Sequence, residues 1–196
     1  MRLYGRRLWP SLAIGIPTAV WASLPRLLHE TPLFVATPLF GALLLAASYV
    51  GAVRIAAGRA IAVPRAFVAA ALVFVPFQFL LVFVVLPALV LFAAVGLAVP
   101  VLALERVPFA RSFGRAWALA RADFVHALGS LAALAIVVAV TQGVMAFVLR
   151  DFGDQTLAAA FFIALVVVSP LFFLGSALLY FDQEARHNAR RAVPHG

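Results

Sequence analysis

The stretch from Ala66 to Leu104 contains no charged residue, and it constrains the fold of this chain more than any other feature. A membrane-spanning helix needs about 20 consecutive apolar residues, so the stretch is too long for one span and long enough for two. Pro87 lies near its centre, where a tight turn would separate two helices. We therefore expect one span at residues 66–86 and a second at residues 88–104.

The composition of the whole chain also indicates a bilayer environment. The 196 residues are 66% hydrophobic and 11% charged, whereas a soluble domain is about half apolar and about a quarter charged. A soluble protein of this length could not bury so much apolar surface in one core. The chain has no cysteine, which excludes disulfides and thiolate metal sites.

Charged residues divide the remainder of the chain into pieces of similar length. We expect four further spans, at residues 8–25, 32–53, 127–149 and 156–181. The predicted fold is therefore all-α: one integral membrane domain over residues 1–196, with six transmembrane helices and no strand alternation of the kind that forms a barrel. A basic start before the first apolar piece is also typical of a cleaved signal peptide, but no clear small-x-small cleavage site follows it.

The distribution of arginine predicts the orientation. With the N-terminus in the cytoplasm, six spans leave only Arg26 and Arg150 outside, where the loops carry Glu30, Asp151 and Asp154. Both termini are then cytoplasmic. The net charge of +8 comes from the cytoplasmic loops, so we do not expect nucleic acid as a partner.

A basic, aromatic segment at residues 108–124 lies between the fourth and fifth spans. As a helix it would present an apolar face at three- and four-residue steps, with Leu119 pointing away from that face. This pattern is typical of an interfacial amphipathic helix. The candidate interface anchors are Phe109, Phe113, Trp117 and Phe124, and the candidate contacts to lipid phosphate are Arg111, Arg115 and Arg121. The simpler interpretation is that the helix only anchors the connection between two spans.

Two short motifs resemble those of a known family. They are "SFGRAWALARADFVHALG", with Ser112, Trp117, Arg121 and Phe124 at matching positions, and "LLYFDQEARHNAR", with Tyr180, Phe181, Asp182 and Arg186. The chain resembles bacterial six-helix integral membrane proteins related to the membrane domain of glycerophosphoryl diester phosphodiesterases. Glu184 departs from the pattern, since the family often has arginine there.

The resemblance implies a six-helix fold in the bacterial cytoplasmic (inner) membrane. It does not imply the phosphodiesterase reaction, which belongs to a separate soluble domain in that family. Metal-assisted hydrolysis needs several converging carboxylates and histidines. The sequence offers only two pairs spaced three apart, Asp123 with His126 and Glu184 with His187. We therefore predict no catalytic residue, no cofactor and no metal site, and a protein that is not an enzyme.

Polar side chains inside the spans are the remaining candidates for function. They include Gln78, Thr141 and Gln142, and the two glutamines are expected to reach each other or a carbonyl freed by Pro76. Hydrogen bonds between membrane helices contribute about 0.6 kcal/mol on average, so structural packing is the default interpretation. A transport path would use the same residues beside broken helices.

The leading functional hypothesis is a non-catalytic, membrane-embedded module that binds lipids with anionic headgroups or a partner membrane protein. The alternative is a transporter or permease component, which would need a water-accessible cavity reaching Gln78 and Gln142. Asp182 ends the last expected span at the depth of the basic helix. It is expected to form an ion pair either with Arg111, Arg115 or Arg121, or with Arg186, four residues further along the same helix.

Overall fold

The chain folds entirely into helices in the computed structural model, which describes residues 2–27, 36–105 and 107–192. These residues contain eight α-helices and no strand, so the predicted all-α class is confirmed. The helices are α1 (Arg2–Leu27), α2 (Ala36–Ala57), α3 (Val63–Phe83), α4 (Val85–Val95), α5 (Ala98–Leu104), α6 (Phe109–Ala122), α7 (Phe124–Val148) and α8 (Asp154–Ala192).

Five helical segments of the described residues are long and apolar enough to cross a membrane, by length and composition. They are Thr37–Ala57, Val63–Leu81, Val85–Leu104, Phe124–Val148 and Asp154–Ala189. The first expected span, 8–25, lies within α1, which is not among the five. Residues 32–35 of the second expected span lie outside the described residues. The sixth was expected to end at residue 181, but α8 continues without a break to Ala192.

The break between α3 and α4 lies at Val84, three residues before the expected turn at Pro87. Val84 adopts an extended conformation, with φ −151° and ψ 118°, while its N–H still bonds to the carbonyl of Leu80. Pro87 is the third residue of α4. The first four N–H groups of a helix have no partner within it, so a proline in this turn removes no helical bond. Pro87 therefore starts a helix here and does not separate two.

A buried tyrosine compensates for a proline in the segment formed by α4 and α5. Pro100 has no N–H, so the carbonyl of Gly96, four residues earlier, loses its usual helical donor. The hydroxyl of Tyr49 in α2 donates to this carbonyl over 3.3 Å, and the N–H of Val99 donates over another 3.3 Å. The freed carbonyl is thus satisfied inside an apolar core, where an unpaired one would be costly.

Aromatic rings surround this tyrosine and form the centre of the core. The ring centroid of Tyr49 lies 5.9 Å from that of Phe74, 5.5 Å from Phe92 and 6.4 Å from Phe173. These rings come from α2, α3, α4 and α8. Tilted and edge-on pairs at such distances are the favoured aromatic geometry. One cluster therefore joins four helices that are far apart in the sequence.

Helix α1 crosses α8 at a glycine. A Cβ on Gly15 would lie 2.7 Å from the Cα of Val166, so only glycine permits this approach. Pro170 removes the helical donor for the carbonyl of Val166, and Gly15 packs against that same backbone. Helix α1 is also bonded to α2, since the hydroxyl of Ser48 donates to the carbonyl of Ile14 over 2.7 Å. Small residues commonly allow such contacts between membrane helices.

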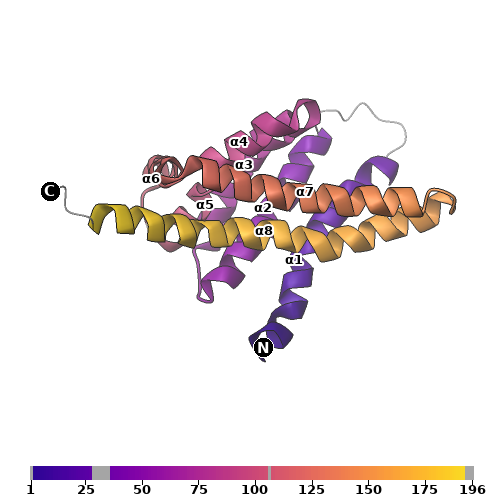
Figure 1. Cartoon of the computed structure of the whole chain (residues 1–196), viewed down its shortest axis with the longest axis horizontal. Coiled ribbons are helices and arrows are strands. Elements are labelled where there is room, and N and C mark those ends of the chain that lie inside the picture. The colour runs from indigo at the N-terminus through magenta and orange to yellow at the C-terminus, as the bar shows by residue number, and fades with distance from the viewer. Residues whose placement is uncertain (1, 28–35, 106, 193–196) are drawn as a thin grey trace.

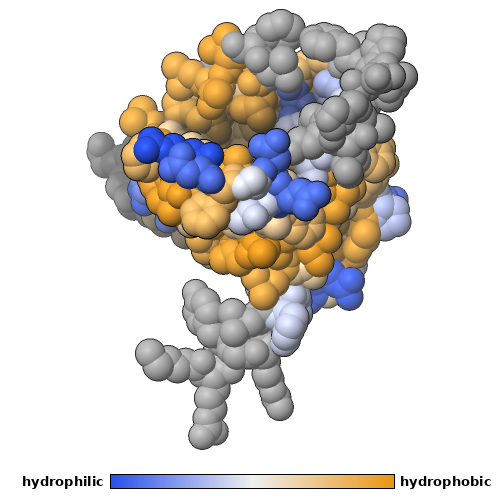
Figure 2. All heavy atoms as spheres, turned by 90° about the vertical axis from the view of Figure 1, so that its right-hand side faces the viewer, coloured by the Kyte–Doolittle hydropathy of each residue, from blue (hydrophilic) through white to orange (hydrophobic). Residues whose placement is uncertain are grey.

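Helices α7 and α8 form a long antiparallel hairpin along the length of the molecule (Figure 1). Little of α7 is buried: its buried side chains are Ala127 and Leu131, both near its first turns, and the rest of the helix is exposed or partly exposed. The end of the molecule where the hairpin turns carries a small hydrophilic area surrounded by apolar surface (Figure 2). The exposed polar residues at this turn include Arg150, Asp151 and Asp154. This pattern fits a hairpin whose sides face an apolar medium and whose tip reaches water.

The crossing of α1 and α8 makes a prediction about two helical glycines. Gly15→Ala should lower the melting temperature in detergent, because its Cβ meets the backbone of Val166 and overpacking of this kind costs about 1–3 kcal/mol. Gly143→Ala is the matched control, because nothing lies within 4 Å of its Cβ position and alanine favours a helix by about 1 kcal/mol. Equal melting temperatures for the two variants would show that α1 does not pack on α8 at Gly15.

Candidate functional site

Helix α6 forms the predicted basic segment and turns sharply at both ends. It begins after Pro108, whose backbone is extended at φ −58° and ψ 147°. It ends at Asp123, a single residue that separates it from α7. The side chain of Asp123 accepts the N–H of His126 over 3.4 Å, which caps the start of α7. In Figure 1, α6 is seen nearly end-on while α7 and α8 run across the view, so α6 lies crosswise to the hairpin.

The face of α6 that packs against the other helices consists mainly of small residues. Its fully buried members are Ser112, Ala116, Leu119 and Ala120. Ala116, Leu119 and Ala120 pack with residues of α5 and with Tyr180 of α8. Leu119, two residues after the exposed Trp117, lies on this inward face and is 0% exposed. Alanines on the inner face allow a close approach that phenylalanine and tryptophan would prevent.

The four candidate interface anchors divide into two groups. Trp117 is 47% exposed and Phe109 is 39% exposed, so both lie on the outer surface of the protein. Phe113 and Phe124 are partly buried and pack against the core. The sequence pattern placed all four on one face, but the helix is rotated so that its smallest side chains face inward. Trp117 and Phe109 are accordingly the two aromatics available to a surrounding lipid phase.

Glu105 joins α6 to α8 beside the start of α6. Its carboxylate accepts the hydroxyl of Tyr180 over 2.9 Å and pairs with the Nε of Arg115 over 3.3 Å. Glu105 directly follows α5, so three helices meet at one carboxylate. Arg115, a candidate contact to lipid phosphate, is thus partly neutralised within the protein.

Arg186 joins α8 to the other end of α6. Its Nη1 bonds to the carboxylate of Asp123 over 2.9 Å, and its Nε bonds to the carboxylate of Asp182 over 2.9 Å. The ring of His126 lies 3.2 Å from the same Asp182 oxygen and 3.3 Å from Arg186 Nη2. The amide of Gln183, fully buried, donates to the backbone carbonyl of Asp123 over 3.5 Å. The junction between α6 and α7 is therefore fastened to α8.

This geometry decides how Asp182 is paired. Within the described residues, its carboxylate pairs with Arg186, the local alternative four residues along the helix, and lies beside the His126 ring, but it forms no ion pair with Arg111, Arg115 or Arg121. Helix α6 is nevertheless docked on α8, but we expected the acid on α8 and the base on α6, and the structure has the reverse. The acid, Asp123, lies at the end of α6, and the base, Arg186, lies on α8.

Arg111 and Arg121 are the two exposed arginines of α6. Neither forms an ion pair with another described residue. The guanidinium carbon of Arg121 lies 6.0 Å from the centroid of the Trp117 ring, at the limit of a cation–π contact. The outer surface of α6 therefore combines two arginines with an exposed tryptophan.

The intramembrane polar residues do not come together as the sequence suggested. Gln78 is 1% exposed, and its amide nitrogen has no hydrogen-bond partner within the described part of the chain. Gln142 lines a cavity of about 240 Å³ between α1, α7 and α8, and both of its amide atoms lack a described partner. The hydroxyl of Thr141 donates to the carbonyl of Val137 in its own helix over 2.8 Å. The two glutamines thus lie in different surroundings.

Sequence reasoning missed Glu105 and the role of Asp123. A signal for Glu105 was present, because it is the first charged residue after the uncharged stretch and so lies at the end of a span, as Asp182 does. The described residues include no group of three or more His, Cys, Asp or Glu that could hold a metal ion. The guanidinium of Arg186 lies between the two carboxylates it binds, so the arrangement positions helices.

No protein-family model, curated protein or solved structure matches this chain. The resemblance to the membrane domain of glycerophosphoryl diester phosphodiesterases therefore stays a prediction, and what the chain does has to be inferred from its own residues.

Because Arg186 contacts both Asp123 and Asp182, replacing Arg186 should destabilise the protein more than replacing Asp182. Arg186→Ala should destabilise the protein by about 1 kcal/mol, because it removes both contacts of a partly exposed arginine and leaves two carboxylates without their cation. Asp182→Ala should cost only about 0.3–0.5 kcal/mol, since Arg186 keeps Asp123. Thermal melting in detergent checks this order. An equal loss in both variants would mean that Asp123 does not hold Arg186.

Proposed function

We propose that this chain is a non-catalytic, multi-pass protein of the bacterial inner membrane that binds anionic lipid headgroups through helix α6. The observation that carries the proposal is the outer surface of α6. The buried alanine face, Glu105 and Arg186 fix this helix crosswise to the α7–α8 hairpin. Arg111, Trp117 and Arg121 remain exposed. Basic and aromatic side chains on a crosswise helix are the features of an interfacial helix that contacts lipid phosphates.

The proposed topology has six spans and places both termini in the cytoplasm. In Figure 1, the connection between α2 and α3, helix α6 and the end of α8 lie toward the left. The break between α3 and α4 and the turn between α7 and α8 lie toward the top and the right. Helix α6 and the end of α8, two segments that carry several arginines, thus lie together at one end of the molecule, which supports the orientation inferred from the positive-inside rule.

Helix α1 is the sixth span in this proposal, in addition to the five apolar segments. Its packing supports a retained helix, because Gly15 contacts the backbone of α8 and Ile14 accepts a hydrogen bond from Ser48 of α2. Thr18 also lies 3.3 Å from the Ser48 hydroxyl, with both side chains buried. A signal peptide that is cleaved would contribute none of these contacts to the mature protein.

The alternative of a transporter or permease component has less support. It requires a water-filled path that includes both glutamines near mid-depth. Gln78 is buried in α3, while Gln142 lines a cavity between α1, α7 and α8. Gln78 is not among the described residues that line that cavity. A partner membrane protein remains compatible with the long exposed side of α7.

The proposed topology can be checked with single cysteines, because the native chain has none. Gln155→Cys at the α7–α8 turn should react with a membrane-impermeant maleimide in intact cells. Ala189→Cys near the end of α8 should react only after the cells are opened. Both positions are exposed, so both should react in detergent. Labelling of Ala189→Cys in intact cells would contradict the proposed orientation.

The proposed function predicts that α6 sets the retention of anionic lipid. Replacing Arg111 and Arg121 with glutamate should reduce co-purifying phosphatidylglycerol by about tenfold or more, since each basic residue near an anionic surface contributes about 1 kcal/mol. Lipid extraction and mass spectrometry of the purified protein measure this ratio.

The control is Arg150→Glu at the α7–α8 turn, which changes the charge in the same sense at the far end of the hairpin. It should leave the phosphatidylglycerol content near the level of the parent protein. If the α6 variant also retains that level, α6 is only a connector and lipid binding through it is wrong.

A further inference from the structure

An open cavity of about 690 Å³ lies between α1 and α2, away from α6. Its apolar wall on α1 comes from Pro10, Ala13, Ile14 and Pro17, which recur at three- and four-residue steps and so share one face of the helix. The wall on α2 comes from Ala47, Ser48, Gly51, Arg54 and Ile55, which follow the same periodicity. Two helix faces built from small residues and prolines therefore leave a cleft between them.

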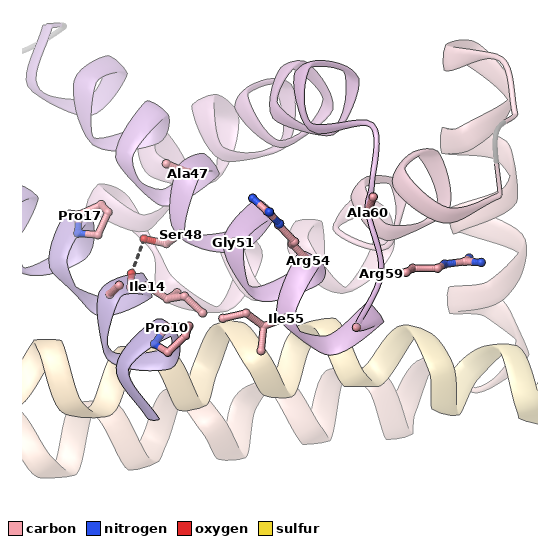
Figure 3. A pocket seen from close by; sticks show the side chains of 12 residues that line it. Pro10, Ile14, Pro17, Ala47, Ser48, Gly51, Arg54, Ile55, Arg59 and Ala60 are labelled. Carbon is pink, nitrogen blue, oxygen red and sulfur yellow. Dashed lines mark hydrogen bonds between the residues drawn. The ribbon is translucent and has the colours of Figure 1, made fainter. Parts of the chain in front are cut away.

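The cavity is hydrophobic along most of its length and basic at one end. Arg54, in the last turn of α2, and Arg59, in the following loop, are its charged lining residues, and none of the described residues that line it is acidic. The loop turns at Gly58, whose φ of 63° favours glycine. Figure 3 shows Arg54 extending from α2 beside the cleft, while Arg59 points away from α1. Arg59 also donates to the carbonyl of Leu104 over 3.4 Å.

The guanidinium of Arg54 has no ion-pair partner within the described part of the chain. The other polar lining side chain is already engaged, because the Ser48 hydroxyl donates to the carbonyl of Ile14 (Figure 3). Away from the basic end, the exposed residues of the rim are apolar and include Ala13 and Ala47, with Leu43 one turn before Ala47. The cleft thus opens toward an apolar surface and carries the unpaired guanidinium of Arg54 at its end.

We propose that this cleft binds one anionic phospholipid, with its phosphate at Arg54 and an acyl chain between α1 and α2. Charge complementarity selects the headgroup, because the end of the cleft offers a planar donor for phosphate oxygens and no competing carboxylate. The apolar walls fit an acyl chain, which can enter from the bilayer through the lateral opening of the cleft. The volume lies within the roughly 300–1,000 Å³ of typical ligand pockets. The inference rests on the membrane placement proposed above, but not on lipid binding by α6.

The test measures lipid binding to the full chain in detergent by native mass spectrometry. It uses the Arg111→Gln, Arg121→Gln background, which removes the exposed arginines of α6. Three probes are compared: dioleoyl phosphatidylglycerol, dioleoyl phosphatidylcholine and glycerol 3-phosphate. We expect one molecule of phosphatidylglycerol to bind per chain, about fivefold tighter than phosphatidylcholine, and no binding of glycerol 3-phosphate. Equal binding of the two lipids, or binding of the free glycerol phosphate, would overturn the proposal.

Two kinds of variant test the contributions of the headgroup contact and of the apolar cleft separately. Arg54→Gln should weaken phosphatidylglycerol binding by about fivefold, whereas Arg59→Gln is the matched control and should change it much less, because its side chain points away. Ala47→Leu should also reduce binding, since it fills the cleft from an exposed position without altering the charge. Circular dichroism melting confirms that each variant is folded.

Each remaining outcome overturns the proposal in a recognisable way. Undiminished binding in Arg54→Gln would rule out this arginine as the phosphate ligand. Undiminished binding in Ala47→Leu would show that the lipid is attracted by surface charge and does not enter the cleft. Lipid binding by α6 is tested separately, in the parent chain. Either proposal can therefore fail without the other: the cleft can bind its lipid when α6 binds none, and α6 can bind lipid when the cleft is empty.

Discussion

The hydrogen bond from the Tyr49 hydroxyl to the carbonyl of Gly96 is the contact on which the rest of the core depends. In a chain this apolar, hydrophobic burial does not distinguish one helix arrangement from another, because lipid tails are as apolar as leucine. Specificity has to come from close packing and from the few polar groups that need partners. Pro100 leaves the carbonyl of Gly96 without its helical donor, and the hydroxyl of Tyr49 donates to that carbonyl. The aromatic rings of α3, α4 and α8 pack around Tyr49.

The same principle applies at the two ends of α6, where buried or partly buried charged groups need partners. Glu105 and Asp123 lie just before and just after α6, and each is paired with a residue of α8. Helix α8 is therefore the common partner: Gly15 crosses it, Phe173 contributes to the aromatic cluster, and Arg186 secures the junction of α6 and α7. Its continuous extent from Asp154 to Ala192 allows one helix to serve all these contacts.

Hydropathy and charge spacing predicted the helical class and five of the segments now found to be apolar enough to cross a membrane. They did not predict which face of α6 turns inward, because periodicity groups Phe109 with Phe113 but does not reveal that alanines suit a close contact better. The position of the α3–α4 break was missed for a related reason, since Pro87 is compatible with a helix start as well as with a turn. The partners of Asp123 and Glu105 lie 63 and 75 residues away in sequence, and no local pattern encodes such contacts.

The sparse burial of α7 has a consequence for how this protein behaves outside a bilayer. Beyond Ala127 and Leu131, α7 has no buried side chain among the described residues, so its outer half is held in place chiefly by α8 and by whatever solvates its exposed apolar side. Lipid acyl chains supply lateral pressure there that a detergent micelle does not. Extraction therefore weakens the far end of the hairpin first, while the Asp123 end keeps its anchor to Arg186. We therefore expect the amide hydrogens of α7 to exchange along a gradient in detergent, slowest beside α6 and fastest toward the turn.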